Sequence, residues 1–190
     1  MAIAIHIPGI QGDCKLDGFK KKGSRSYFVA ESFSFGIERE MKESAEKGGT
    51  EDINIGVGEL QECSISKSMD SASADLAQAA IQGNNLGDAE IYFIEIAGEK
   101  KGLDTGVRVY LAYKLHRCMV KTWSTSGDAD DRPTEEVSFL FNKIAFAYAA
   151  HDGTNWVSEG NRYMGWDNVE NCKWDQKQAA LKVGSAWKPS

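Results

Sequence analysis

The sequence predicts a mainly β fold: a single-domain, two-sheet β barrel with one short α-helix. Apolar and polar residues alternate along most of the chain, which is the pattern of strands with one buried face. Helical spacing with a start and a stop signal occurs only around residues 70–83. The chain has 190 residues, 42% of them hydrophobic, so it can build one sizeable core but leaves little room for two domains.

The first predicted strand covers residues 2–7, where isoleucine alternates with other residues until a Pro-Gly pair ends the run. Residues 11–25 are polar and are expected to form a loop. A long strand follows over residues 27–38, in which Glu31 interrupts the apolar face and marks a bulge or an interface. Residues 40–52 are charged and lack periodicity, so they predict a long loop. The apolar face of the long strand consists of Tyr27, Val29, Phe33, Phe35 and Ile37.

Two shorter strands, residues 53–57 and 60–67, precede the helix. Asp70 or Ser71 is expected to cap the start of the helix, because their side-chain oxygens accept hydrogen bonds from the free backbone N–H groups there. Gly83 is expected to end the helix, because glycine readily adopts the left-handed conformation found after helix C-termini. The narrow apolar stripe of the helix is expected to pack on the core, and it consists of Leu76, Ala79 and Ala80, with Ile81 as a further candidate.

The second half of the chain contains a strand at residues 90–97 and two longer strand patterns. The pattern from residue 107 changes phase at residues 116–117, and the pattern from residue 137 changes phase at residues 142–143. We interpret both changes as β-bulges within long strands, which a strongly curved sheet needs.

The C-terminal region holds most of the tryptophans. They could form a sugar-binding platform, but we favour a tail that wraps the barrel and buries its aromatic rings against it. The four cysteines are far apart and lack metal-ligand spacing, so they are expected to be reduced and mostly buried. The tryptophans of this region are Trp156, Trp166, Trp174 and Trp187, and the four cysteines of the chain are Cys14, Cys63, Cys118 and Cys172.

The charge of the chain and its apolar stretches exclude several function classes. A net charge of −6 argues against nucleic acid as the main partner, which favours clustered Lys and Arg. No apolar stretch is long enough to cross a bilayer, so membrane insertion is not expected. The N-terminus lacks the features of a signal peptide, so we expect synthesis in the cytoplasm and export, if any, without a cleaved leader.

An acidic turn within residues 124–141 runs directly into an aromatic strand. Its carboxylates could bind calcium, but the spacing of an EF-hand is absent. They could also form a glycosidase acid/base pair, although the sequence cannot place two of them in one cleft. A salt-bridge clamp or a subunit contact made by Arg132 suits the turn better. We therefore predict no catalytic, metal or cofactor site in this turn, whose acids are Asp128, Asp130, Asp131, Glu135 and Glu136.

Several dispersed blocks together resemble the haemolysin-coregulated protein (Hcp) family, the tube subunits of bacterial type VI secretion systems. The resemblance covers residues 1–175 and leaves residues 176–190 as a short C-terminal extension. It implies a homohexameric ring that stacks into a tube. It also implies a contractile sheath and a spike protein as partners, and effector proteins as cargo. The blocks are residues 33–36 (Phe-Ser-Phe-Gly), 65–70 (Ile-Ser-Lys-Ser-Met-Asp), 124–127 (Ser-Thr-Ser-Gly), 131–138 (Asp-Arg-Pro-Thr-Glu-Glu-Val-Ser) and 165–167 (Gly-Trp-Asp).

Strand alternation and the resemblance together suggest two kinds of site. If Phe33, Phe35 and Ile37 face the core, the intervening small residues face away from it, on a surface that lines the lumen in this family. The charged loop and the acidic turn are expected to make ring or subunit contacts. The lumen candidates are Ser32, Ser34 and Gly36, and the contact candidates are Glu43, Lys47, Asp128, Asp131, Arg132 and Glu135.

Two alternatives from other classes stay open at this point. One is a virion tail-tube protein, a structural relative whose tube conducts DNA. The other is an enzyme or glycan-binding β protein that uses the tryptophan-rich tail and the acidic turn.

Overall fold

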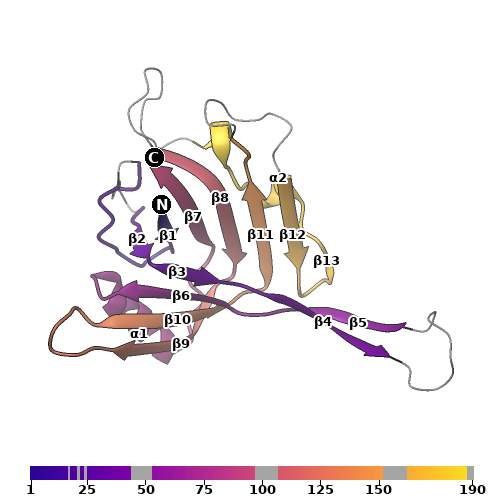
Figure 1. The fold of residues 1–190 in the computed structure, drawn as a ribbon, viewed down its shortest axis with the longest axis horizontal. Helices are drawn as coiled ribbons and strands as arrows, with labels where there is room; N and C mark the ends of the chain where they lie inside the picture. Colours follow the sequence, from indigo (N-terminus) through magenta and orange to yellow (C-terminus); the bar gives the residue numbers. More distant parts are fainter. Residues whose placement is uncertain are drawn as a thin grey trace.

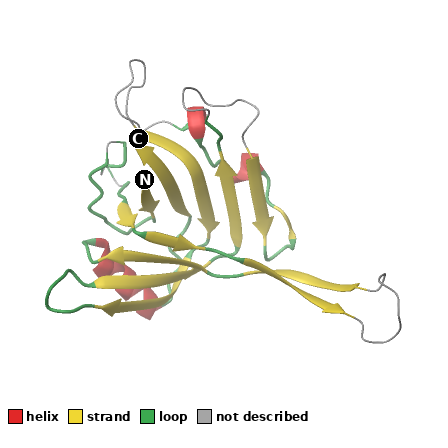
Figure 2. Ribbon diagram, in the orientation of Figure 1, coloured by secondary structure: helices red, strands yellow, loops and turns green. Residues whose placement is uncertain are grey.

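A computed structural model describes residues 1–16, 18–20, 22–23, 25–43, 53–96, 107–151 and 162–187. It confirms a mainly β fold, with two main antiparallel sheets, a projecting two-stranded hairpin and short helices (Figures 1 and 2). In Figure 1 the strands of the smaller sheet run crosswise below those of the larger sheet. No helix in these described ranges is long and apolar enough to cross a membrane.

The larger sheet has seven strands in the order β13-β12-β11-β8-β7-β1-β2, and each neighbouring pair is antiparallel. Its strands are β1 (Ala2–His6), β2 (Phe28–Ala30), β7 (Ala89–Ile96), β8 (Val107–His116), β11 (Lys143–Tyr148), β12 (Arg162–Asp167) and β13 (Cys172–Lys173).

The smaller sheet has four strands in the order β3-β6-β10-β9. Strands β4 and β5 pair only with each other and form a hairpin that extends away from both sheets in Figure 1; we call it the arm. The strands are β3 (Ser32–Ser34), β6 (Cys63–Ser68), β9 (Met119–Ser126) and β10 (Thr134–Leu140), with β4 (Ile37–Glu43) and β5 (Ile53–Leu60) in the arm.

The two phase changes in the second half of the chain are not bulges, and our interpretation of them was wrong. Strand β8 belongs to the large sheet and β9 to the small one, and the chain turns between them at Arg117, whose φ is 53°. The second change, at residues 142–143, lies where the chain passes from β10 in the small sheet to β11 in the large sheet. The side-chain phase restarts because each strand enters a different sheet. Register shifts do occur, at Ser138/Phe139 and Phe93/Ile94.

The long strand expected over residues 27–38 is divided into β2, β3 and the start of β4. Phe28 is buried and Val29 is 38% exposed, the reverse of the predicted faces. The phase changes at Glu31, whose backbone N–H donates to the carbonyl of Ser66 at 2.8 Å. Glu31 therefore marks the step between sheets. The loop expected over residues 40–52 is also shorter than predicted, because β4 continues to Glu43; residues 44–52 lie outside the described residues.

The large sheet is covered on both of its faces. The inner face packs against the small sheet and the helix α1 (Ala72–Gln82) around residues such as Ile5, Ile91, Leu115 and Phe139. The outer face packs against the loop after β1 and the C-terminal segment. The outer cluster includes Ala4, Phe19, Tyr27, Tyr92, Ile94, Val109, Leu181 and Val183.

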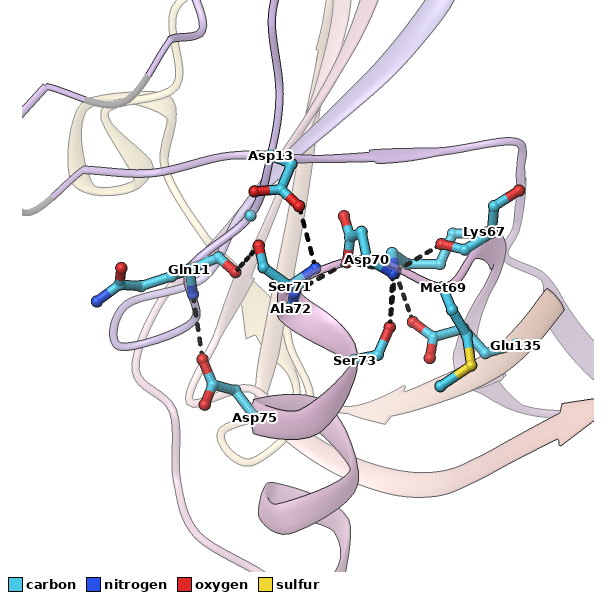
Figure 3. Close-up of polar contacts among 12 residues, drawn as sticks. Gln11, Asp13, Lys67, Met69, Asp70, Ser71, Ala72, Ser73, Asp75 and Glu135 are labelled. Atoms are coloured by element: carbon cyan, nitrogen blue, oxygen red, sulfur yellow. Dashed lines mark hydrogen bonds and ion pairs between the residues drawn. The ribbon is translucent and has the colours of Figure 1, made fainter. Parts of the chain in front are cut away.

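Helix α1 begins and ends at the predicted residues. The Asp70 carboxylate accepts the backbone N–H of Ala72 at 2.9 Å, so Asp70, and not Ser71, provides the side-chain cap (Figure 3). Gly83 follows the helix with a left-handed φ of 64°, and its N–H donates to the carbonyl of Ala79. Asp75 in the first turn accepts the backbone N–H of Gln11, which ties the helix to the loop after β1 (Figure 3).

The C-terminal segment packs against the barrel, as we favoured. Trp174 is buried, and the Trp187 ring stacks on Phe19 with the ring centroids 5.0 Å apart. Residues 176–187, expected as an extension, include the short helix α2 (Gln176–Ala179) and the 3-10 turn Gly184–Ala186, and they complete the outer cluster. Trp156 lies outside the described residues. All four cysteines are free, and all but Cys172 are buried.

Candidate functional site

The small sheet has one face in the core and one open face lined by Ser and Thr. Cross-strand pairing sets these residues in three rows, which we call the hydroxyl face. One row is Ser34, Ser64, Ser138 and Thr122, the middle row is Ser32, Ser66, Glu136 and Ser124, and the third row is Ser68, Thr134 and Ser126. Glu136 is thus the single residue in these rows without a hydroxyl group.

Alternation along each strand separates this face from the core. In β6 the residues Cys63, Ile65 and Lys67 are buried, whereas the serines between them are partly exposed. In β10, Val137 and Phe139 are buried in the same way. Successive side chains of a strand point to opposite sides of the sheet, so the buried set holds the sheet in place. The hydroxyl set lies on the other side, and all of its members except Ser138, which is 8% exposed, are partly or fully exposed.

The hydroxyl groups bond to one another across the strands. The Oγ atoms of Ser32 and Ser66 are 2.6 Å apart, and Thr122 Oγ1 lies 2.6 Å from Ser138 Oγ. A shallow hollow of about 210 Å³ lies over the first two rows and is bordered by Glu136. Hydroxyl groups both donate and accept hydrogen bonds, so this surface suits reversible polar contacts.

A buried charge cluster supports the hydroxyl face from the core side. Lys67 Nζ lies 2.7 Å from Glu135 Oε1 and 2.7 Å from Asp70 Oδ1 (Figure 3). The side chains of Lys67 and Glu135 are both 0% exposed. The indole N–H of Trp123 donates to the other Glu135 oxygen at 3.0 Å. The cluster therefore joins β6, β10 and β9 to the start of α1.

This geometry corrects the expectation for Glu135. We placed it among the contact residues on the surface of the subunit, but its carboxylate is enclosed and its charge is matched by Lys67. Glu135 shares the parity of Val137 and Phe139, so strand alternation already placed it on the core side.

Three further carboxylates lie at or near the hydroxyl face, and they differ in their interaction partners. Glu62 pairs with Lys121 at 3.0 Å, and hydrogen bonds from Lys121 and Ser138 lower the pKa of this carboxyl group. Glu31 accepts a hydrogen bond from the Ser68 hydroxyl. The Glu136 carboxylate makes no hydrogen bond or ion pair within the part of the chain that the structure describes.

The lumen candidates lie partly on this face. Ser32 and Ser34 are exposed members of its first two rows. Gly36 lies beyond the rows, where β3 leads into the arm, and its carbonyl accepts the N–H of Gln61 at 3.0 Å. A Cβ at this position would lie 2.2 Å from the Gln61 Oε1 atom, at the end of a flexible side chain that can move aside. The sequence prediction missed the serines and threonines of β6, β9 and β10, although their every-second-residue spacing was visible.

The other contact candidates lie on the acidic turn and the arm. Asp128, Asp131 and Arg132 are exposed in the turn between β9 and β10. The Asp131 carboxylate accepts the backbone N–H of Arg132 at 2.7 Å. The guanidinium group has no partner among the described residues, so a clamp inside the subunit is not observed. Glu43 ends β4 on the arm, and Lys47 lies outside the described residues.

An apolar groove of about 480 Å³ lies at the base of the arm. Ile37 and Leu60, which are cross-strand partners in the arm, form one side, and Met164 and Trp166 of β12 form the other. Ile37 is 57% exposed. The groove brings together residues more than 100 positions apart, so local sequence patterns could not show it.

The described residues offer little support for a cysteine nucleophile or for a metal site in the acidic turn. Burial raises the pKa of the Cys118 thiol to about 12, so it stays protonated at neutral pH. The carboxylates of the acidic turn do not gather as metal ligands; within the described ranges, only Asp167, Glu170 and Cys172 do so. Asp167 already pairs with Lys143 at 2.5 Å and accepts the N–H groups of the turn that follows β12.

Comparisons with known proteins agree with this architecture. The family model described as "Type VI secretion system effector, Hcp" matches residues 5–148. A solved structure titled "Structure of a type six secretion system protein" is 25% identical, with a TM-score of 0.75, and the match covers 91% of this chain and 99% of that one. No match was found among curated proteins.

Two more distant structures share the fold. A type VI secretion system effector from Yersinia pestis is 16% identical with a TM-score of 0.61, covering 87% of this chain and 98% of its own. Hcp1 from Salmonella typhimurium is 18% identical with a TM-score of 0.60, covering 92% and 100%. Since the family model alone spans most of the sequence, the chain belongs to the Hcp family, the structural, non-enzymatic and secreted tube and effector proteins of type VI secretion systems.

Proposed function

We propose that this chain assembles into a homohexameric ring whose lumen is lined by the hydroxyl face, and that the rings stack into a tube carrying effector proteins. The observation that carries the proposal is the unequal covering of the two sheets. The large sheet is packed on both faces, whereas the small sheet presents an open, polar face of short side chains. Such a face suits the inner surface of a lumen through which other proteins pass.

Short hydroxyl side chains favour weak and reversible cargo contacts. Each hydrogen bond to a cargo replaces one to water, so its net contribution is only about 1 kcal/mol. The three rows of the hydroxyl face contain no apolar side chain that would hold a cargo by burial. A cargo held in this way can be retained in a closed ring and released when the ring opens.

Ring and tube contacts are assigned to three exposed features. The acidic turn offers Asp128, Asp131 and Arg132, whose guanidinium group is available for a carboxylate of a neighbouring copy. Glu43, which ends β4 on the arm, and Lys47, which lies outside the described residues, are also proposed as contact residues. The groove at the base of the arm would bury Ile37 and Leu60 against a second copy of this chain, since exposed apolar patches on soluble subunits mark interaction sites. A head-to-tail interface with a closing rotation gives a ring and covers free sheet edges.

The remaining partners follow from membership of the family. The tube would be built in the cytoplasm, end at a spike protein and be propelled outward by a contractile sheath. Nucleic acid is not expected as cargo, because the chain carries a net charge of −6.

The lumen assignment can be tested by thiol accessibility. In a Cys172→Ser background, which removes the exposed native thiol, a cysteine placed at Ser34 is compared with one placed at Ile81, an exposed residue of α1 outside the proposed contacts. In rings verified by electron microscopy, a small maleimide should label both positions, whereas a large polyethylene glycol maleimide should label only position 81. Equal labelling of both positions by the large reagent would contradict the assignment.

Cargo binding is tested by Ser34→Gln, which adds a longer side chain to the first row of the hydroxyl face. Rings should still assemble, because Ser34 is exposed and makes no core contact. Cargo co-purification should fall. Unchanged cargo retention by intact rings would count against the hydroxyl face as the cargo surface.

A further inference from the structure

We propose that the hydroxyl face receives a basic segment of a guest polypeptide, with the Glu136 carboxylate as the charged anchor. This inference rests on the proposed lumen and adds the chemistry of the guest.

The charge balance of the small sheet is the first step. Its four strands contain only two cationic residues, Lys67 and Lys121. Lys67 points into the core and pairs with Glu135, and Lys121 pairs with Glu62 beside the hydroxyl face. Glu136 is left without a counter-charge from these strands, so the hydroxyl face carries an uncompensated negative charge.

The position of Glu136 is the second step. Its cross-strand partners are Ser66 on β6 and Ser124 on β9, so hydroxyl groups flank the carboxylate on both sides. The carboxylate borders the hollow of about 210 Å³. An ammonium or guanidinium group has several N–H donors and no acceptor, and it would find one carboxylate and several hydroxyl oxygens there.

The same surroundings exclude other guests. An acidic segment would be repelled by Glu136 and by Glu31, which hydrogen bonds to Ser68 at the end of the third row. An apolar segment would find no apolar side chain in the three rows. A polypeptide with Lys or Arg among small polar residues matches both the charge and the hydroxyl groups.

Ring formation would strengthen this weak site. One exposed ion pair contributes about 0.2–1 kcal/mol. In the proposed ring, every copy of Glu136 faces the same enclosed space, so several weak contacts act on one guest. Because exposed charges are screened by salt, guest binding should weaken as the ionic strength rises.

The test measures peptide binding to assembled rings by fluorescence anisotropy. One labelled peptide carries arginines separated by Gly-Ser spacers, and a matched peptide carries glutamates in place of the arginines. The basic peptide should bind at low salt and the acidic peptide should not. Glu136→Gln should weaken binding of the basic peptide at least about fivefold, because one exposed pair accounts for about that much and every copy in the ring loses its carboxylate. Glu170→Gln, the same change on an exposed turn of the large sheet, should leave the affinity unchanged.

A second variant separates the two proposals. Ser124 is exposed beside Glu136, so Ser124→Trp should block the hollow without disturbing the core. If Ser124→Trp removes binding but Glu136→Gln does not, the lumen assignment stands and the charge anchor is wrong. If intact Ser124→Trp rings still bind the peptide, the guest lies elsewhere and the basic-guest proposal fails, whereas the lumen assignment is judged by the labelling of position 34. Equal binding of the two peptides, or no binding of either, would also overturn the basic-guest proposal.

Discussion

Lys67 and Glu135 bring opposite charges into contact in a place without solvent. Removing both charges from water is costly, and their attraction offsets that cost only because further hydrogen bonds complete the site. Asp70, Ser73 and the Ser68 carbonyl accept from Lys67, and Trp123 donates to Glu135. The pair therefore acts as a fixed joint between the small sheet and α1.

Replacing Lys67 with Met should destabilise the subunit by about 3–5 kcal/mol, because the Glu135 charge is then buried without a partner. Urea unfolding measures this change. The control is Lys121→Met on the same sheet. The side chains of Lys121 and its partner Glu62 are 47% and 39% exposed, so loss of this ion pair should cost about 1 kcal/mol or less. The double variant Lys67→Met with Glu135→Leu should recover part of the loss, since both charges are then absent. Equal effects of the two single lysine substitutions would show that burial of the pair is unimportant.

At the residue scale, the alternation of apolar and polar residues predicted that the serines of β3 are exposed. The same reasoning was not applied to the serines and threonines of β6, β9 and β10. Ser64, Ser66 and Ser68 alternate with buried residues in the same way, so these members of the hydroxyl face were predictable. The enclosure of Glu135 was also predictable, because it shares the parity of Val137. Its pairing with Lys67 was not, since the two residues are 68 positions apart.

At the scale of secondary-structure elements, helix α1 was predictable because its capping residue and its terminal glycine act locally. The change of sheet at Arg117 was not, because a bulge and a change of sheet cause the same slip in side-chain phase. The arm was predicted only in part. Residues 53–57 were expected as a strand, but the charged residues at the end of β4 lack periodicity and resembled a loop.

The base of the arm carries a second prediction. Ile37→Glu should abolish ring assembly, because it introduces a charge into the apolar groove, while the subunit itself stays folded. Ile37 is more than half exposed, so its stability effect should stay within about 0.5 kcal/mol. Sedimentation velocity measures assembly, and urea unfolding measures stability.

The matched control is Ile81→Glu on α1, an exposed isoleucine away from the groove. Rings of this variant should form normally. Rings that persist in Ile37→Glu would show that the groove is not a subunit interface.

At the scale of the whole molecule, the C-terminal segment closes the outer face of the large sheet. Leu181 and Val183 are buried beside Phe19, Tyr92 and Ala147. The sequence alone separated residues 176–190 from the domain, because this segment packs with residues that are far from it in the sequence. These residues belong to the packed fold as far as residue 187.

Leu181→Ala should therefore destabilise the protein by about 2–3 kcal/mol, as expected for a buried leucine. The melting temperature should fall by about 4–12 °C in a chain of this size. Its neighbour Lys182 is exposed, so Lys182→Ala provides the control and should melt close to the unaltered protein. Thermal unfolding followed by circular dichroism makes the comparison, and an unchanged melting temperature in Leu181→Ala would show that the segment contributes nothing to the fold.

The alternation along β6, β9 and β10 has one more consequence, for how this protein can change over time. Along these strands, alternate positions serve separate tasks, folding on one side and outside contact on the other. The alternation is kept up to the register shift at Ser138/Phe139, beyond which Val120 of β9 lies in the core. Substitutions among the serines and threonines leave the buried set untouched, so they meet little resistance from folding. Evolution can therefore change which molecules bind the hydroxyl face, one side chain at a time, while the fold beneath it stays the same.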